Sequence, residues 1–190
     1  MKIVFNPFIK YTEKQLLPLA IIITIAGCFI AHYCNTRYDG ILDLHFGNNV
    51  SKLAPFKDNG INILVLFFLL YTAGKYINGK TRAVDIFVTV VTARLPLYVL
   101  PVININNQMQ EISLKVIDSN SQHAEISTLE TLFIITTTII IILFVIWYIV
   151  VLYNGFKVSA NAKGIKHNIL FIIAIILAEA ASKITIAAIN

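Results

Sequence analysis

Two opposite charges inside long apolar stretches are the residues of this sequence best placed to do chemistry. Arg94 is the eleventh residue of the apolar run that begins at Val84, and Glu179 is the eleventh of the run that begins at Ile169. An unpaired Arg at the centre of a bilayer costs ~2.5–3.5 kcal/mol on insertion scales. An opposite charge at ~4 Å returns about 4 kcal/mol at an effective dielectric of ~20. The positions therefore predict an intramembrane charge pair between Arg94 and Glu179.

Such a pair has two interpretations. Together with the threonines Thr136–Thr138 of another apolar run, it could line a polar pathway or cavity for a small solute or ion. It could instead be a structural pair that orients two helices. A transport route usually needs more polar groups than these, which favours the structural interpretation.

Two further charges lie near this pair. Lys183 follows Glu179 by four residues on the same helix face and is a competing partner, although it is closer to the outer surface and could extend there. Asp85 marks the start of a run and is expected to cap it. Asp85 and Arg94 are nine residues apart, ~13 Å along a helix axis and nearly opposite in azimuth, so no direct contact between them is expected.

Prolines interrupt the run that contains Arg94. Pro96 and Pro101 each remove a backbone donor, which predicts a kinked helix with free carbonyls at Thr92 and Leu97. Broken helices can build binding sites in transporters, but a simple kink is the preferred interpretation here.

Other chemical signatures are weak. Possible metal ligands are scattered on the outer side without a recognised spacing, and we expect no metal site and no cofactor: Cys28, His32, Cys34, Asp39, Asp43, His45, Asp118 and His123. No Ser-His-Asp arrangement or pair of catalytic carboxylates is apparent, so an enzyme is not expected.

The segment from Gly74 to Thr81 matches the literal pattern of a phosphate-binding loop. That motif needs a preceding strand and a following helix in a soluble nucleotide-binding fold. Here its first half ends an apolar run, so we interpret it as a basic hairpin turn and expect no nucleotide.

The elements that must position these residues are membrane helices. Of the 190 residues, 57% are hydrophobic and 13% are charged, and the mean hydropathy is +0.77. Soluble domains carry roughly 25% charged residues. Five apolar runs have the ~20 residues that span a bilayer as helices. We therefore expect an all-α polytopic membrane protein with a single membrane domain over 1–190 and spans at about 16–33, 61–77, 84–103, 131–153 and 169–189.

Charge in the connections orients the spans. Nine Lys and Arg residues lie on one side and four on the other, where the four are Arg37, Lys52, Lys57 and Lys115. The nine are Lys2, Lys10 and Lys14 of the N-terminal segment and the basic turns Lys75, Lys80, Arg82, Lys157, Lys163 and Lys166. The positive-inside rule predicts a cytoplasmic N-terminus and an outer C-terminus. The formal charge of +5 thus reflects topology, and we expect no nucleic-acid partner.

The connections carry three further predictions. Asn6-Pro7 favours a short interfacial helix before the first span. Alternating residues at 41–46 and at 111–118 predict two strands that pair into a small outer β-cap. Ser127 and Glu130 have capping-box spacing, which marks the start of the fourth span.

Several local features together resemble the Yip (Ypt-interacting protein) domain family. They are Asn6-Pro7-Phe8, the hairpin Gly74…Gly79-Lys80, Arg94-Leu95-Pro96, and the segment from Trp147 to Lys157 with its W…L…G pattern. Eukaryotic members act in vesicle trafficking and contact small GTPases, partly through a long cytoplasmic N-terminal region. This chain has about fifteen residues there, so it is more similar to compact bacterial members. The resemblance implies a bacterial cytoplasmic membrane and carries over no catalytic residue.

These observations favour a non-enzymatic integral membrane protein that organises partners or its membrane environment. It would act through lateral helix contacts and the basic turns around Lys80 and Lys163. The partners expected are the lipid bilayer, an unidentified membrane protein and a further copy of the chain. The alternative is a small-solute or ion transporter subunit that uses Arg94 and Glu179, and a third possibility is an outer-facing sensor built on the β-cap.

Overall fold

Helices make up most of the chain in the computed structural model, which describes residues 2–119 and 126–189. The order of elements is α1 (Lys2–Phe5), the 3-10 helix η1 (Pro7–Ile9), α2 (Glu13–Tyr33), β1 (Thr36–Arg37), β2 (His45–Phe46), α3 (Ala54–Ile77), α4 (Ala83–Ala93), the 3-10 helix η2 (Leu95–Asn107), α5 (Gln108–Ser119), α6 (Thr128–Ala160) and α7 (Ile165–Ile189). Five helical stretches are long and apolar enough to cross a membrane, which confirms the expected fold class.

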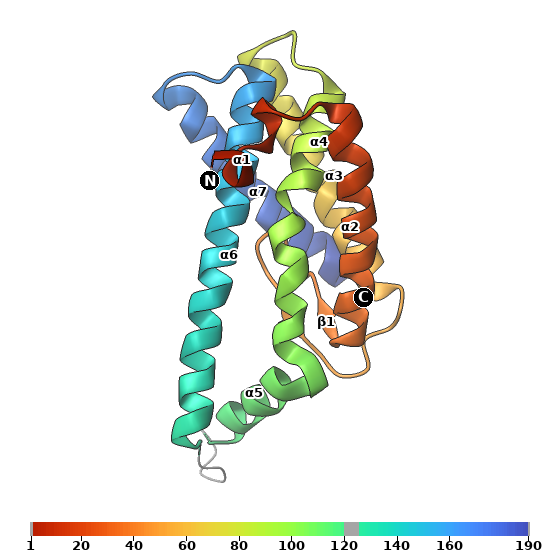
Figure 1. Ribbon diagram of the computed structural model, residues 1–190, viewed down its shortest axis with the longest axis vertical. Helices are drawn as coiled ribbons and strands as arrows, with labels where there is room; N and C mark the ends of the chain where they lie inside the picture. The colour runs from red at the N-terminus through yellow and green to blue at the C-terminus, as the bar shows by residue number, and fades with distance from the viewer. Residues whose placement is uncertain (1, 120–125, 190) are drawn as a thin grey trace.

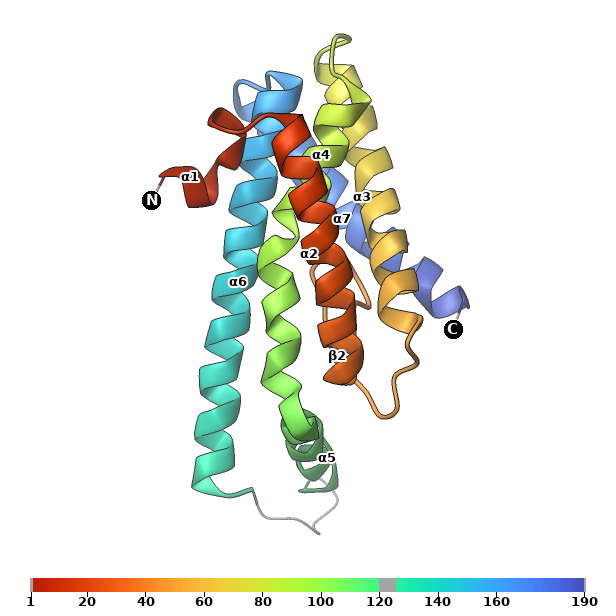
Figure 2. The same ribbon diagram turned by 45° about the vertical axis from the view of Figure 1, so that its right-hand side comes forward.

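The helices form one bundle in which α4 and η2 are central (Figure 1). Here α4 packs against α2, α3 and α6, while α7 packs mainly against α3. The main core combines side chains of α3, α4, η2, α6 and α7. Examples are Leu66, Leu70, Ile86, Leu152 and Ala178. In the views of Figures 1 and 2, α7 crosses the bundle obliquely, whereas α6 runs along its full length.

The helices begin earlier than the apolar runs predict. The second span starts at Ala54 rather than Ile61, with Pro55 in its first turn, and α6 starts at Thr128. The added turns of α3 contain the polar residues Asp58 and Asn59, which neighbouring segments bury. At the start of α6 the predicted capping box is present: Ser127 Oγ accepts from the Glu130 amide at 3.2 Å, and Glu130 Oε2 accepts from the Ser127 amide at 2.9 Å.

The predicted kink lies in the third span. The α-helical geometry of α4 ends at Ala93, and the chain continues as the 3-10 helix η2, which contains Pro96 and Pro101. The Leu97 amide donates to the Arg94 carbonyl at 2.9 Å, the three-residue spacing of a 3-10 turn. A second break follows at Asn106, whose φ of 56° turns the chain into α5. Figure 1 shows α5 lying crosswise beyond the end of η2.

The β-cap prediction was right about a strand at His45-Phe46 and wrong about its partner. The antiparallel partner is β1 of the same loop, with Thr36 opposite Phe46 and Arg37 opposite His45. Residues 111–118 are helical and belong to α5. Their apolar residues at 112, 116 and 117 also fit a helical period, which explains why alternation over eight residues was ambiguous.

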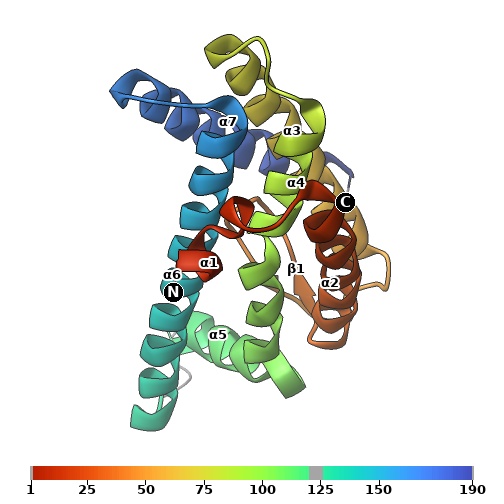
Figure 3. The same cartoon turned by 45° about the horizontal axis from the view of Figure 1, so that its top comes forward.

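The N-terminal segment forms two short pieces instead of one interfacial helix. Both pieces lie against α6, as Figure 3 shows. Trp147 Nε1 donates to the Val4 carbonyl at 3.1 Å, and Asn154 Nδ2 donates to the Phe5 carbonyl at 2.9 Å. The N-terminal segment, the α3–α4 turn and the α6–α7 turn all lie at one end of the bundle, and α5 lies at the other (Figures 1 and 2).

Gly27 provides a test of the packing between α2 and η2. A Cβ at this position would lie 2.5 Å from Cγ and 2.6 Å from Cβ of Tyr98, which cannot move without shifting η2. We expect Gly27→Ala to lower the free energy of unfolding by about 1–3 kcal/mol through overpacking. Gly60→Ala in α3 is the matched control, because no heavy atom lies within 4 Å of its added Cβ. Unfolding in a denaturing detergent series measures both, and equal stability of the two variants would contradict the expectation.

Candidate functional site

The loop between α2 and α3, residues 34–53, folds back into the bundle instead of covering it. Thr36 and Ile41 are completely buried and Tyr38 is 1% exposed. Ile41 belongs to the main core and contacts the helices there. The irregular backbone between β1 and β2 needs partners for its amides and carbonyls, since it lies outside the strand pair and the apolar core offers none.

The two charges inside the membrane helices supply those partners. Arg94 Nη1 donates to the Ile41 carbonyl at 3.3 Å, and Glu179 Oε2 accepts from the Leu42 amide at 2.9 Å. This carbonyl and this amide belong to the same peptide group. The guanidinium therefore faces the negative end of the peptide dipole and the carboxylate faces its positive end. We name this arrangement of Arg94, Glu179 and the Ile41–Leu42 peptide the loop clamp.

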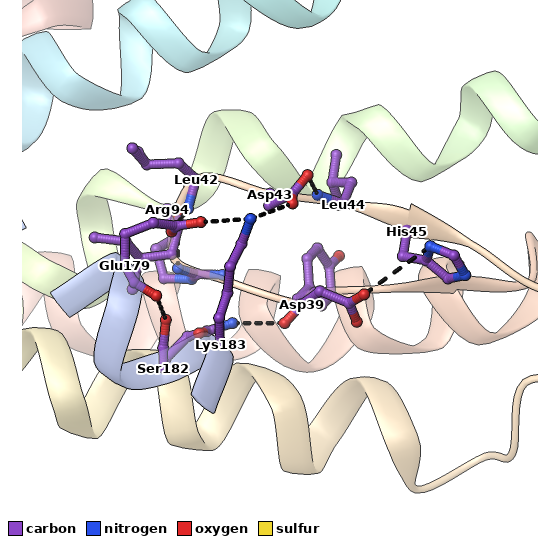
Figure 4. Close-up of polar contacts among 12 residues, drawn as sticks. Asp39, Leu42, Asp43, Leu44, His45, Arg94, Glu179, Ser182 and Lys183 are labelled. Atoms are coloured by element: carbon purple, nitrogen blue, oxygen red, sulfur yellow. Dashed lines mark hydrogen bonds and ion pairs between the residues drawn. The ribbon is translucent and has the colours of Figure 1, made fainter. Parts of the chain in front are cut away.

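The direct Arg94–Glu179 ion pair that the sequence predicted is replaced by this peptide-mediated contact. Within the described residues, the ion-pair partner of Glu179 is Lys183, whose Nζ lies 3.2 Å from Oε1. Lys183 also contacts Asp43 of the loop at 2.7 Å (Figure 4). The sequence could not reveal this, because the loop that separates the two charges was expected outside the membrane. Asp85 is in the first turn of α4 but does not cap it as expected: the helix has no side-chain cap hydrogen bond, and Asp85 pairs instead with Arg82 at 2.5 Å.

Gly40 allows the clamp to close. A Cβ at this position would lie 2.5 Å and 2.7 Å from the two carboxylate oxygens of Glu179. The carboxylate can therefore approach the loop backbone only because residue 40 has no side chain. Two neighbouring carbonyl contacts complete the loop's attachment: Asn62 Nδ2 donates to the Tyr38 carbonyl at 2.8 Å, and Tyr38 Oη donates to the Gly27 carbonyl at 3.2 Å.

A buried polar cluster surrounds the guanidinium of Arg94, which is completely buried. Arg94 Nε donates to Asn59 Oδ1 at 2.9 Å, and Asn59 also bonds the hydroxyl of Tyr98. The ring of Tyr38 lies 5.9 Å from the guanidinium carbon. Amide, carbonyl and aromatic groups thus replace part of the water that Arg94 would otherwise need, while its Nη2 is buried without a hydrogen-bond partner among the described residues.

A second ion pair holds the other end of the loop. The carboxylate of Asp58 is fully buried and accepts from Arg37 Nε at 2.8 Å and Nη2 at 2.6 Å. This bidentate pair joins β1 to the first turns of α3. The hydrogen bond to Asp58 raises the pKa of Arg37 above its usual value. Sequence reasoning missed Asp58, Asn59 and Asn62, although a polar i, i+1, i+4 pattern next to an apolar run was a usable signal.

The possible metal ligands have separate partners. Cys28 Sγ lies 3.6 Å from the Pro55 carbonyl and from Asn59 Nδ2, and His32 Nδ1 lies 2.9 Å from the Val50 carbonyl. Burial raises the pKa of the Cys34 thiol, which keeps it protonated. No group of three or more potential ligands gathers in residues 2–119 and 126–189. His123 lies outside the described residues.

The basic turns are exposed at the same end of the bundle. The α3–α4 turn and the α6–α7 turn both lie at the end that carries the N-terminal segment (Figure 1). The exposed cations of these turns and of the adjoining helix ends are Lys75, Lys80, Arg82, Lys157, Lys163 and Lys166. The literal phosphate-loop pattern falls on the end of α3 and on the turn after it, where Lys75 Nζ donates to the Gly79 carbonyl at 2.9 Å.

The helices around the clamp correspond to a known family. The family model of the Yip1 domain matches residues 53–181, which is more than half of the chain. This chain belongs to the Yip1 domain family. No curated protein and no solved structure matches it. The resemblance that the sequence suggested is confirmed, and the chain is an integral membrane protein of this family.

The matched region of this Yip1 domain contains part of the clamp. Arg94, Glu179, Asp58 and Asn59 lie inside it, whereas Arg37 and the Ile41–Leu42 peptide lie before it. The Asn6-Pro7-Phe8 segment also lies outside the match. The family match thus covers α3, α4 and most of α7, whereas α2 and residues 34–52 of the loop lie before it.

Proposed function

We propose that this Yip1 domain is a non-catalytic membrane scaffold that holds a partner protein at its basic end. That end is proposed to face the cytoplasm, in accord with the charge asymmetry of the connections. The observation that carries the proposal is that two turns far apart in sequence, within Lys75–Arg82 and Lys157–Lys166, lie at the same end of the bundle and carry six exposed cations. A cationic end of this kind complements an acidic protein surface.

The buried charges support a scaffold better than a solute pathway. Arg94 is closed off from solvent, and its Nε and Nη1 are engaged with Asn59 and with the loop backbone. A solute would have to displace the loop that includes Ile41 before it reached Arg94. The clamp instead gives the helices a fixed arrangement, and a fixed arrangement presents the turns in a constant geometry.

Charge neutralisation at the basic end tests the proposal. We expect Lys80→Gln with Lys163→Gln to reduce retention of a stoichiometric protein partner by about tenfold, measured by native mass spectrometry after gentle release from the native membrane. The local turns should survive, because the contacts of these residues within the turns use their backbone amides, at 3.0 Å to Asn78 Oδ1 and 2.9 Å to His167 Nδ1.

Lys52→Gln with Lys57→Gln is the matched control, since both lysines are exposed and belong to the opposite side in the predicted topology. Equal loss of the partner in both double variants would contradict a specific basic surface. Retention of a second copy of the chain would identify the partner as the protein itself. A retained small solute or ion, lost when Arg94 and Glu179 are replaced, would instead support the transporter alternative.

A further inference from the structure

An apolar groove lies beneath the N-terminal segment. Its volume is about 450 Å³, within the ~300–1,000 Å³ of small-molecule sites. The groove runs between α2, the α4–η2 junction and α6, and its walls include Leu16, Leu19, Leu95, Pro96, Trp147 and Val151. Inside a bilayer, an apolar groove between membrane helices is accessible to the acyl chains of lipids.

A polar pocket of about 230 Å³ adjoins this groove at the basic end. The two spaces share Tyr11 and Leu16 in their walls, so an apolar and a polar compartment lie side by side. The polar pocket is lined by Glu13, Arg82, Asp85 and Ser159. An apolar space that adjoins a charged one matches the outline of a single lipid, with tail and headgroup in adjacent compartments.

The charges of the polar pocket point to a headgroup that carries both signs. Arg82 contacts Asp85 at 2.5 Å and Glu13 at 3.4 Å. One cation therefore faces two carboxylates. An ammonium can bind the carboxylates while a phosphate binds Arg82, whose side chain is 59% exposed.

The wall of the groove contains one polar group without a partner. Within the described residues, the hydroxyl of Thr92 is buried and makes no hydrogen bond. Such a group costs free energy unless something bonds to it. A lipid ester carbonyl entering the groove would accept this hydrogen bond.

We propose that this groove and pocket hold one zwitterionic phospholipid whose headgroup ends in a primary ammonium. The acyl chain lies along Leu19, Leu95 and Trp147. The phosphate binds Arg82, and the ammonium binds Glu13 and Asp85. The apolar wall of the site lies within the bundle, and Arg82 is the residue that the site shares with the six exposed cations of the basic end.

Native mass spectrometry with defined lipids tests the site. The purified protein is incubated with phosphatidylethanolamine or phosphatidylglycerol of identical acyl chains, and retained lipid is counted. We expect one phosphatidylethanolamine per chain and weaker retention of phosphatidylglycerol. Leu19→Trp, which fills the groove, should lower retention by about tenfold. Glu13→Gln should lower the preference for phosphatidylethanolamine about two- to fivefold.

Leu177→Trp is the matched control. Leu19 is 53% exposed and Leu177 is 52% exposed, and Leu177 lines a separate apolar groove between α3 and α7. This variant should retain the lipid as the unmodified protein does. Equal losses in the two tryptophan variants, or equal retention of both lipids by the unmodified protein, would overturn the proposal and indicate ordinary boundary lipid. Circular dichroism establishes that each variant is folded.

Discussion

Arg37→Met is expected to destabilise the protein by about 3–5 kcal/mol, the largest single effect that the structure implies. The carboxylate of Asp58 is fully buried and receives two hydrogen bonds from Arg37, at 2.6 and 2.8 Å. Removing the guanidinium leaves a buried anion without its cation. A methionine of similar length keeps most of the apolar contacts of the side chain, so the effect reports the charge. Reversible unfolding in mixed detergent micelles measures it.

Two comparisons make this result interpretable. Arg37→Met combined with Asp58→Leu removes both charges and should recover most of the lost stability, because the desolvation cost of the pair disappears with it. Arg82→Met disrupts another bidentate Arg–Asp contact, but at an exposed position, and should change stability far less. If Arg37→Met lost no more stability than Arg82→Met, water would have to reach the carboxylate of Asp58, which would contradict its burial.

In a double-mutant cycle of the loop clamp, replacing both charged residues should not recover the stability that a single replacement loses, unlike in the Arg37–Asp58 pair. Arg94→Leu leaves the buried Ile41 carbonyl without a donor, and we expect it to cost about 1–3 kcal/mol. Glu179→Leu should cost less, since Glu179 is 21% exposed and the Leu42 amide can find water more easily. The double replacement removes the partners of both ends of one peptide group. It should therefore be at least as unstable as Arg94→Leu alone.

This cycle separates the clamp from a direct ion pair. In a direct pair, replacing the second charge relieves the unpaired first one, so the double variant recovers stability. Glu179→Gln is the control, because its amide oxygen can still accept the hydrogen bond from Leu42. It should remain close to the original stability. Recovery of stability in the double variant Arg94→Leu, Glu179→Leu would contradict the clamp. Denaturation in a detergent series measures the four proteins of the cycle and the Glu179→Gln control.

The clamp explains how a loop with only one short strand pair is held among membrane helices. Its backbone groups are satisfied by side chains that come from three different spans: Asn62 of α3, Arg94 at the end of α4, and Glu179 of α7. Each contact alone is modest, about 0.5–3 kcal/mol. Together they fix the position of the loop, and the loop in turn fixes the spacing of the helices that contact it.

The sequence by itself determined the membrane architecture. Apolar length settles which segments are spanning helices, because a bilayer leaves the backbone no other way to satisfy its hydrogen bonds. Proline chemistry likewise predicted the break after Arg94, and the Ser127 capping box predicted the start of α6. These features depend on local residues and on the solvent, so they can be predicted without knowing which helices are neighbours.

Only the tertiary structure decided what the charges contact. Arg94 and Glu179 were identified correctly as unusual, but their common partner is a peptide group more than fifty residues before Arg94 in the chain. Residues 111–118 alternate like a strand but form a helix, because the apolar residues at 112, 116 and 117 fit a helical period as well. Partner choice depends on which segments the whole fold brings within hydrogen-bonding distance. For a loop that folds back into the bundle, residue types and their spacing in the sequence do not predict which side chains come within hydrogen-bonding distance of its backbone.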